Sequence, residues 1–94
     1  MGKDEAIAVI NELLLPLRLA GVSCGISGVG NILEVTIDNS YCMVVIDRNF
    51  KRRLMQMCNS FSMSFRGEDT QFIADYFQAY ISNSQKALDS LLEE

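Results

Sequence analysis

The spacing of apolar residues changes from helical to strand-like near Gly21, and this change limits the fold more than any other feature of the sequence. Before Gly21, apolar side chains recur every three or four residues, which places them on one face of a helix. They are Ile7, Ile10, Leu14 and Leu17. The pattern predicts an amphipathic helix over residues 4–20, with Asp4 as its cap, Gly21 after its last turn and a bend at Pro16.

Two alternating segments follow the helix and predict an antiparallel hairpin. Residues 22–27 and residues 33–38 each alternate between two kinds of side chain, which is the period of a half-buried strand. The glycine spacing of residues 25–30 fits neither the dinucleotide-binding fingerprint nor a P-loop, and no helix is expected directly after it. We therefore interpret this stretch as part of the hairpin and not as a phosphate-binding loop.

A third strand is expected from Tyr41 to about Asp47, after a tight turn at Asn39-Ser40. Unlike the first two strands, it carries apolar side chains on both of its sides. Strands of this kind are usually buried on both faces. The sequence therefore predicts that this strand is central in the sheet, or covered on both faces, and that Val45 lies in the core.

The next segment fits a middle helix followed by an ambiguous stretch. Residues from about 50 to 60 place their apolar side chains on one side of a helix. Residues 60–66 then alternate strictly, which favours a fourth strand, although Phe61 and Phe65 would also share one face of a helix. We take the strand as the prediction.

A long last helix is expected after Gly67, and the polar residues 82–85 favour a break in it near Ser82. Together these elements predict an α+β fold: an antiparallel sheet of three or four strands, with an N-terminal helix, a middle helix and a long C-terminal helix. The first and last helices are expected to cover one face of the sheet. The core is expected to include Leu14, Val35, Val45, Ile73 and Phe77.

The length of 94 residues predicts a single α+β domain over residues 1–94. Hydrophobic residues make up 49% of the chain, which is high for so small a core. Small monomeric domains rarely leave large apolar patches exposed. The surplus of apolar residues therefore favours a homodimer or a docked partner protein.

Net charge and cysteine usage narrow the classes of function. The net charge of −4 at pH 7 opposes a general affinity for nucleic acid or for anionic membranes. Cys24, Cys42 and Cys58 are widely spaced and odd in number, so they indicate reduced thiols in the cytoplasm rather than a disulfide framework or a zinc site. The sequence also shows no pattern typical of an export signal or a membrane span.

The sequence contains no histidine, the residue that supplies most general bases near neutral pH and many metal sites. The three cysteines lie at positions where we expect packed, unreactive thiols. Glu34, Asp38 and Asp47 lack a metal-ligand spacing and are interpreted as a solvated face. We therefore expect a non-enzymatic protein with no catalytic residues, no metal site and no cofactor.

Half of the eight basic residues lie within six positions, where the middle helix is expected to begin. They are Arg48, Lys51, Arg52 and Arg53. The positive end of a helix dipole disfavours cations, so the cluster either is a solvated group of charges or serves an acidic protein surface or a phosphate. The order of elements also resembles a double-stranded-RNA-binding domain, but such a domain needs basic contacts over several loops and this chain is acidic elsewhere. RNA binding is therefore the least favoured alternative.

Residues 31–38, leading into Tyr41 and Asp47, lie between a leucine-rich first helix and the expected late strand and final helix. With these elements the chain resembles the class I type III secretion chaperones, small acidic cytosolic proteins that bind secreted effectors. The resemblance implies a dimer that holds an extended segment of another polypeptide along apolar grooves. It also implies a protein-binding function without catalysis.

A second interpretation is a small inhibitor encoded by a phage or a mobile element, of the anti-CRISPR kind, that binds a folded host defence protein. This resemblance is one of size, acidity and element order. The chaperone-like interpretation places binding on apolar surfaces, whereas an inhibitor would use the basic cluster to meet its target. The partner-binding residues predicted by the two interpretations together are Arg48, Lys51, Arg52, Arg53, Phe61, Met63 and Phe65.

Overall fold

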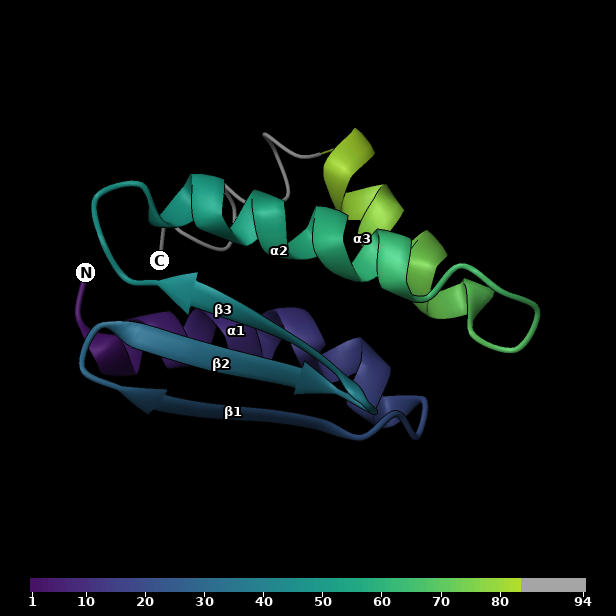
Figure 1. Cartoon of the computed structure of the whole chain (residues 1–94), viewed down its shortest axis with the longest axis horizontal. Helices are drawn as coiled ribbons and strands as arrows, with labels where there is room; N and C mark the ends of the chain where they lie inside the picture. The colour runs from purple at the N-terminus through teal and green to yellow at the C-terminus, as the bar shows by residue number, and fades with distance from the viewer. Residues whose placement is uncertain (84–94) are drawn as a thin grey trace. The chain divides into compact units, whose positions relative to one another are not determined.

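The structure is a computed structural model that describes residues 1–83, and it confirms the predicted α+β class (Figure 1). The elements in chain order are α1 (Lys3–Leu19), β1 (Cys24–Val29), β2 (Ile32–Ile37), β3 (Ser40–Val45), α2 (Phe50–Ser64) and α3 (Gln71–Ser82). The chain divides into two compact units, residues 1–50 and residues 51–94. The first unit holds α1 and the sheet, and the second holds α3 and nearly all of α2. The expectation of a single domain over the whole chain stays a prediction.

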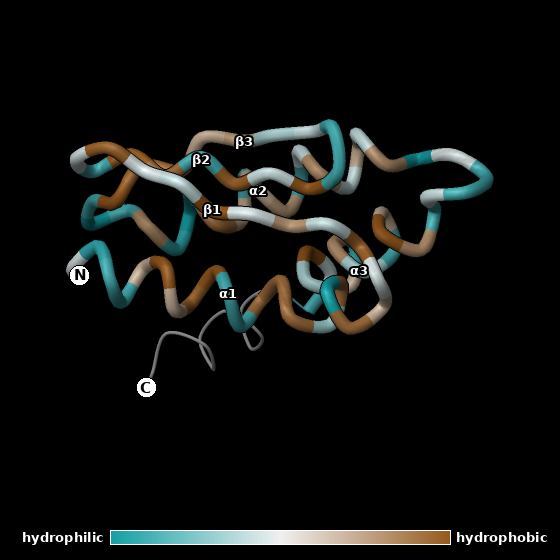
Figure 2. The backbone as a smooth tube through the Cα atoms, turned by 90° about the horizontal axis from the view of Figure 1, so that it is seen from below, coloured by the Kyte–Doolittle hydropathy of each residue, from teal (hydrophilic) through white to brown (hydrophobic). Residues whose placement is uncertain are grey.

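Helix α1 has the amphipathic character that the sequence predicts (Figure 2). It begins at Lys3 with Gly2 at the N-cap, so Asp4 lies inside the first turn and not at the cap. The helix runs through Pro16 as one element. Its buried residues are Ala6, Ile10, Leu13, Leu14 and Leu17.

The C-terminal end of α1 is fixed by a Schellman motif. The Gly21 N–H donates to the Arg18 carbonyl and the Val22 N–H donates to the Leu17 carbonyl, both over 3.0 Å. Gly21 adopts a φ of +89°, which side chains of L-residues disfavour. The predicted helix stop is therefore confirmed, and it turns the chain directly into β1.

The sheet is antiparallel with strand order β1-β2-β3, and α1 runs along one of its faces (Figures 1 and 2). Leu33, Val35 and Ile37 of the middle strand β2 are fully buried. We call the face that carries these residues the inner face. Lys3 contributes to the placement of α1, because its Nζ donates a hydrogen bond of 3.2 Å to the Gly28 carbonyl of β1.

Both hairpins are closed by short turns. Gly30 and Asn31 join β1 to β2, and Gly30 takes a φ of +63°. Asp38 and Asn39 join β2 to β3, one residue earlier than the sequence predicted, and Asp38 has a φ of +50°. Asparagine, aspartate and glycine tolerate this left-handed region better than other residues do, which explains why they occupy the turns.

Two glycines inside β1 make room for side chains of β2. Gly28 pairs with Leu33, and a Cβ on Gly28 would lie 2.6 Å from the Leu33 Cδ2 atom. Gly25 pairs with Thr36, whose hydroxyl donates to the Gly25 carbonyl over 3.3 Å. The glycine-rich stretch is therefore strand and hairpin, as predicted, and its glycines permit close cross-strand packing.

The third strand differs from its prediction. β3 lies at one edge of the order β1-β2-β3, and β2 is central. Val44, which faces inward, is 1% exposed, whereas Val45 is half-buried on the opposite face. The prediction that β3 is central and that Val45 lies in the core was wrong, because apolar side chains on both sides of a strand do not require both sides to be covered.

In the second unit, α2 and α3 contact each other through the side chains of Phe61 and Phe77. These two rings stack with their centroids 5.4 Å apart. Next to them, the Ser62 hydroxyl donates to the Gln78 Oε1 atom over 3.2 Å. Because Ser62 is buried, this bond satisfies a hydroxyl that would otherwise cost free energy.

The predicted fourth strand over residues 60–66 is wrong, because α2 continues to Ser64. The Phe65 N–H still donates to the Phe61 carbonyl over 3.1 Å, as in a helix. Both phenylalanines are buried. Their spacing of four residues therefore reflects about one turn of a helix and not the two-residue period of a strand. The Thr70 hydroxyl then donates to the Phe65 carbonyl over 2.7 Å, which satisfies a backbone acceptor where the helix ends.

Helix α3 begins at Gln71 and buries Ile73 and Phe77, as predicted. It ends at Ser82, where the sequence favours a break, and the Asn83 N–H donates to the Ala79 carbonyl over 3.0 Å. The rest of the predicted long helix lies outside the described residues. The expectation that the last helix covers the sheet stays a prediction.

Candidate functional site

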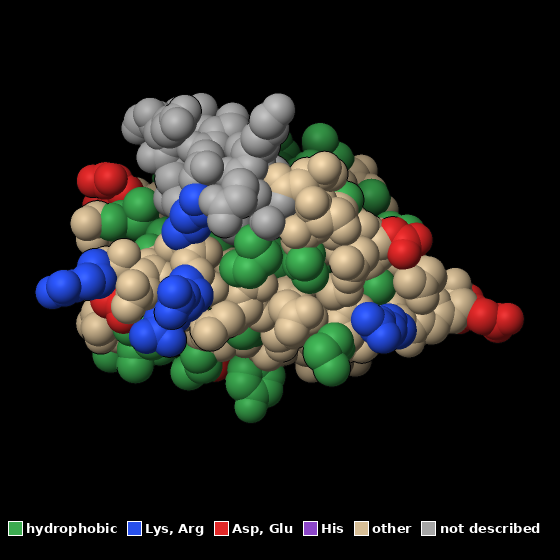
Figure 3. Space-filling view, turned by 90° about the horizontal axis from the view of Figure 1, so that it is seen from above, with side chains coloured by type: hydrophobic (Ala, Val, Ile, Leu, Met, Phe, Trp, Pro, Cys, Tyr) green, Lys and Arg blue, Asp and Glu red, His purple; other side chains and the backbone are tan. Residues whose placement is uncertain are grey.

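The four basic residues predicted to bind a partner lie just before α2 and in its first turn. Figure 3 shows the Lys and Arg side chains that are visible on one face of the molecule. Arg48 and Arg52 are exposed, whereas Lys51 and Arg53 are half-buried. Consecutive residues of a helix point in different directions. The basic side chains therefore spread their charge over the surface and do not converge on a single ligand group.

The three apolar residues predicted to bind a partner do not form one surface. Phe61 is fully buried in α2, and Phe65 is buried in the turn directly after this helix. Met63 is 62% exposed. The structure therefore separates Met63 from the two phenylalanines, because the segment continues as the end of α2 and a turn and not as a strand.

A surface that the sequence did not single out lies on the side of the sheet away from Leu33, Val35 and Ile37. We call it the outer face. By the pairing register and the alternation of side chains along each strand, it is formed by Gly25, Ser27, Val29, Ile32, Glu34, Thr36, Tyr41, Met43 and Val45. Its signal in the sequence is the run of apolar residues on both sides of β3, a pattern that also predicts a strand that is central or covered on both faces.

The outer face consists of three cross-strand rows. One row is wholly apolar: Val29, Ile32 and Val45. The middle row is Ser27, Glu34 and Met43. The third row is Gly25, Thr36 and Tyr41. Four large apolar side chains on this face are well exposed, from 41% for Ile32 to 86% for Val29. These four are Val29, Ile32, Tyr41 and Met43.

A hollow of about 370 Å³ lies on this face beside Glu34. It is lined by Ser27, Gly28, Val29, Ile32, Glu34 and Met43. Ser27 and Gly28 contribute little or no side chain to this lining, whereas Val29, Ile32, Glu34 and Met43 contribute the larger side chains. Glu34 is half-buried, and the structure of residues 1–83 records no hydrogen bond or ion pair for its carboxylate.

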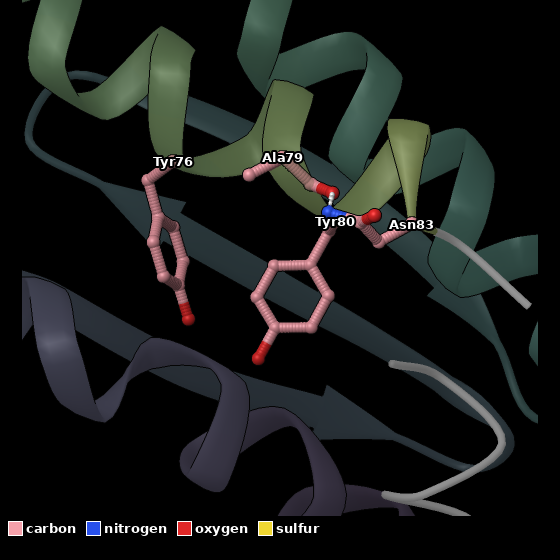
Figure 4. Close-up of a pocket in the computed structure, with 4 residues that line it drawn as sticks. All are labelled: Tyr76, Ala79, Tyr80 and Asn83. Atoms are coloured by element: carbon pink, nitrogen blue, oxygen red, sulfur yellow. Dashed lines mark hydrogen bonds between the residues drawn. The ribbon is translucent and has the colours of Figure 1, made fainter. Parts of the chain in front are cut away.

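A second hollow, of about 190 Å³, lies along α3 and is lined by Tyr76, Ala79, Tyr80 and Asn83 (Figure 4). The two tyrosine rings project from the same side of the helix and meet edge to face, with centroids 5.2 Å apart. Burial raises the pKa of the Tyr76 phenol strongly, and a side-chain hydrogen bond with Tyr80 raises it further. The Tyr76 phenol therefore stays protonated at neutral pH.

The cysteines are placed as packed residues. Cys58 is buried, and Cys24 and Cys42 are half-buried, without a disulfide among the three. Burial raises the pKa of the Cys24 thiol, and Asp38 raises it further, while Arg18 opposes the shift. Because the thiolate is the nucleophilic form, this environment makes Cys24 a poor nucleophile.

Within residues 1–83, no three His, Cys, Asp or Glu side chains gather as they would around a metal ion. None of the described helices has both the length and the apolar character needed to cross a membrane. The absence of catalysis, metal and cofactor stays a prediction.

Comparisons with models of known protein families, with curated proteins and with solved structures gave no match to this chain. The chemistry of its own surfaces is therefore the basis for a functional conclusion.

Proposed function

We propose that this chain is a non-enzymatic, cytoplasmic protein-binding domain that holds a segment of another polypeptide on the outer face of its sheet, in the manner of a small secretion chaperone. The observation that carries the proposal is the group of four exposed apolar side chains on adjacent strands: Val29, Ile32, Tyr41 and Met43. Contiguous exposed apolar side chains rimmed by polar residues are typical of interaction sites.

The site differs from the one expected from the sequence. Phe61 in α2 and Phe65 in the turn after it are buried and are not part of the proposed surface. We therefore propose that the apolar contacts with a partner are made by the outer face and not by these two phenylalanines. It also lies on regular strands, which hold side chains in fixed positions and suit a preformed binding surface.

An inhibitor of a folded protein is the second candidate, and the exposed Arg48 and Arg52 favour it. Charges at the rim of an interface chiefly raise the rate of association, and salt screens this effect. The two functions therefore predict different responses to the same substitutions.

The test is affinity capture with the whole chain in cells of its native source, followed by measurement of the affinity and association rate of the captured partner. For the proposed function, Met43→Thr weakens the complex several-fold, and the double change Arg48→Ala and Arg52→Ala has little effect. Leu15→Ser is the control, because Leu15 is an apolar residue of α1 with an exposure close to that of Met43.

The opposite result supports the inhibitor. If the arginine changes slow association in a salt-dependent way, and Met43→Thr does not weaken the complex, then the outer face is not the binding surface. Sedimentation of the free chain and of the complex decides whether the chain binds its partner as a monomer or as a dimer.

A further inference from the structure

We infer that the outer face binds a polypeptide segment with a Lys or Arg side chain between apolar residues, and that Glu34 in the hollow receives this cation. The inference deepens the proposed function and rests on it.

Glu34 lies at the centre of the outer face. It is the middle residue of the middle row, between Ser27 of β1 and Met43 of β3. Apolar side chains of Ile32, Val29 and Met43 line the hollow beside it. A carboxylate in such a setting gains little from the protein around it, and covering it without a partner of opposite charge would cost free energy. A wholly apolar segment is therefore a poor occupant.

The charge on the outer face indicates that the bound segment should carry a positive charge. Glu34 is the only charged residue among the nine positions of the outer face. At the adjoining strand β1, Lys3 directs its Nζ to the Gly28 carbonyl, and the structure of residues 1–83 shows no ion pair between Lys3 and Glu34. A basic side chain from a partner can therefore complete the hollow, and the net charge of −4 favours the approach of a basic segment.

The same carboxylate argues against a second copy of the chain as the occupant. Two copies that packed their outer faces about a two-fold axis through the middle row would bring the two Glu34 carboxylates close together. Like charges facing each other across an interface are unfavourable. A foreign segment that contributes a cation avoids this repulsion.

The experiment selects peptides from a displayed library of random short sequences on the whole chain. Selected peptides are then synthesised, and their affinities are measured by fluorescence anisotropy. Enriched sequences should contain a Lys or Arg between apolar residues. Glu34→Gln should lower the affinity for these peptides roughly five- to tenfold, which is the effect expected from losing one partly desolvated charge pair. Glu12→Gln, a change at an exposed carboxylate on α1, is the matched control and leaves binding unchanged.

A double-mutant cycle makes the test specific. When the basic residue of the peptide is replaced by leucine, Glu34→Gln should cause no further loss of affinity, because the pair is already broken. Met43→Thr should lower the affinity for both the original peptide and its leucine variant. Circular dichroism and amide hydrogen exchange confirm that each variant remains folded.

Other outcomes overturn the inference in distinguishable ways. Enriched peptides without a basic residue, or an unchanged affinity in Glu34→Gln, exclude the role of Glu34 but leave the outer face as a protein-binding surface. If the peptides bind the Met43→Thr variant with the same affinity as the original chain, the binding site lies elsewhere on the molecule. A dimer that Met43→Thr dissociates shows that a second copy occupies the face. The absence of any enriched peptide overturns the inference, and the capture experiment then decides whether the proposed function also fails.

Discussion

Two neighbouring valines of β3 provide a direct test of which face of the sheet is buried. Val44 is 1% exposed on the inner face, where it pairs with Leu33, and Val45 is half-buried on the outer face, where it pairs with Ile32. Threonine has nearly the shape of valine and a comparable strand propensity, so Val→Thr mainly replaces a methyl group by a hydroxyl. The two substitutions therefore compare the cost of one hydroxyl on each face.

The expected magnitudes follow from burial. At Val44 the hydroxyl loses its water and faces the apolar Leu33 side chain, which costs about 1–3 kcal/mol. At Val45 water remains accessible, and the cost should be below about 0.5 kcal/mol. Against a total stability of about 5–15 kcal/mol, the loss at Val44 is measurable without unfolding the chain.

The assay is urea denaturation followed by far-ultraviolet circular dichroism, with amide hydrogen exchange in β2 as a local measure of the first unit. A loss of 2 kcal/mol lowers the urea midpoint by about 1 M when the slope is about 2 kcal/mol/M. The reasoning is refuted if Val45→Thr costs as much as Val44→Thr, or more. That result would mean that β3 is covered on its outer face, as the sequence alone suggested.

Three further predictions concern a glycine, a tyrosine and a cysteine. Gly28→Ala should destabilise the sheet by about 1–3 kcal/mol, because its Cβ would lie 2.6 Å from the Leu33 Cδ2 atom, whereas Gly67→Ala should change the urea midpoint little, since its nearest neighbour is 3.6 Å away. The raised pKa of Tyr76 means that its contribution to stability is complete below its ordinary pKa of 10.0 and is lost as pH rises above that value; Tyr76→Phe should therefore reduce the alkaline loss in the urea midpoint, and an identical pH profile in both proteins would contradict this expectation. Cys24, in a variant with serine at the other two cysteines, should react with a disulfide reagent more slowly at neutral pH in the folded chain than in urea, because its pKa is raised; equal rates would show that its thiol is neither shielded nor shifted.

The local periods of the sequence were sufficient to predict most of the elements. The helical spacing before Gly21 predicted α1, and two alternating runs predicted the hairpin of β1 and β2. Gly21 and Gly30 mark the chain reversals because only a residue without a Cβ takes a positive φ at little cost. These features depend on neighbouring residues, so they can be read from one sequence.

The segment around Phe61 and Phe65 shows where local pattern is insufficient. Its apolar residues recur at steps of both two and four, so it fits a strand and a helix equally well. The stacking of Phe61 on Phe77 uses a residue sixteen positions away. Packing over this separation favours the helix, and the sequence pattern of residues 60–66 contains no record of it.

The sequence by itself determined the α+β class, the first helix, the three strands and the glycine turns, because these follow from spacing and from the backbone preferences of nearby residues. Only the tertiary structure decided that β2 and not β3 is central, that Val44 and not Val45 is buried, and that Glu34 lies in a hollow among exposed apolar side chains. The physical reason is that alternation assigns side chains to two faces of a strand but does not state which face another element covers. That choice depends on which strands pair and on where α1 packs, and it creates the candidate binding surface.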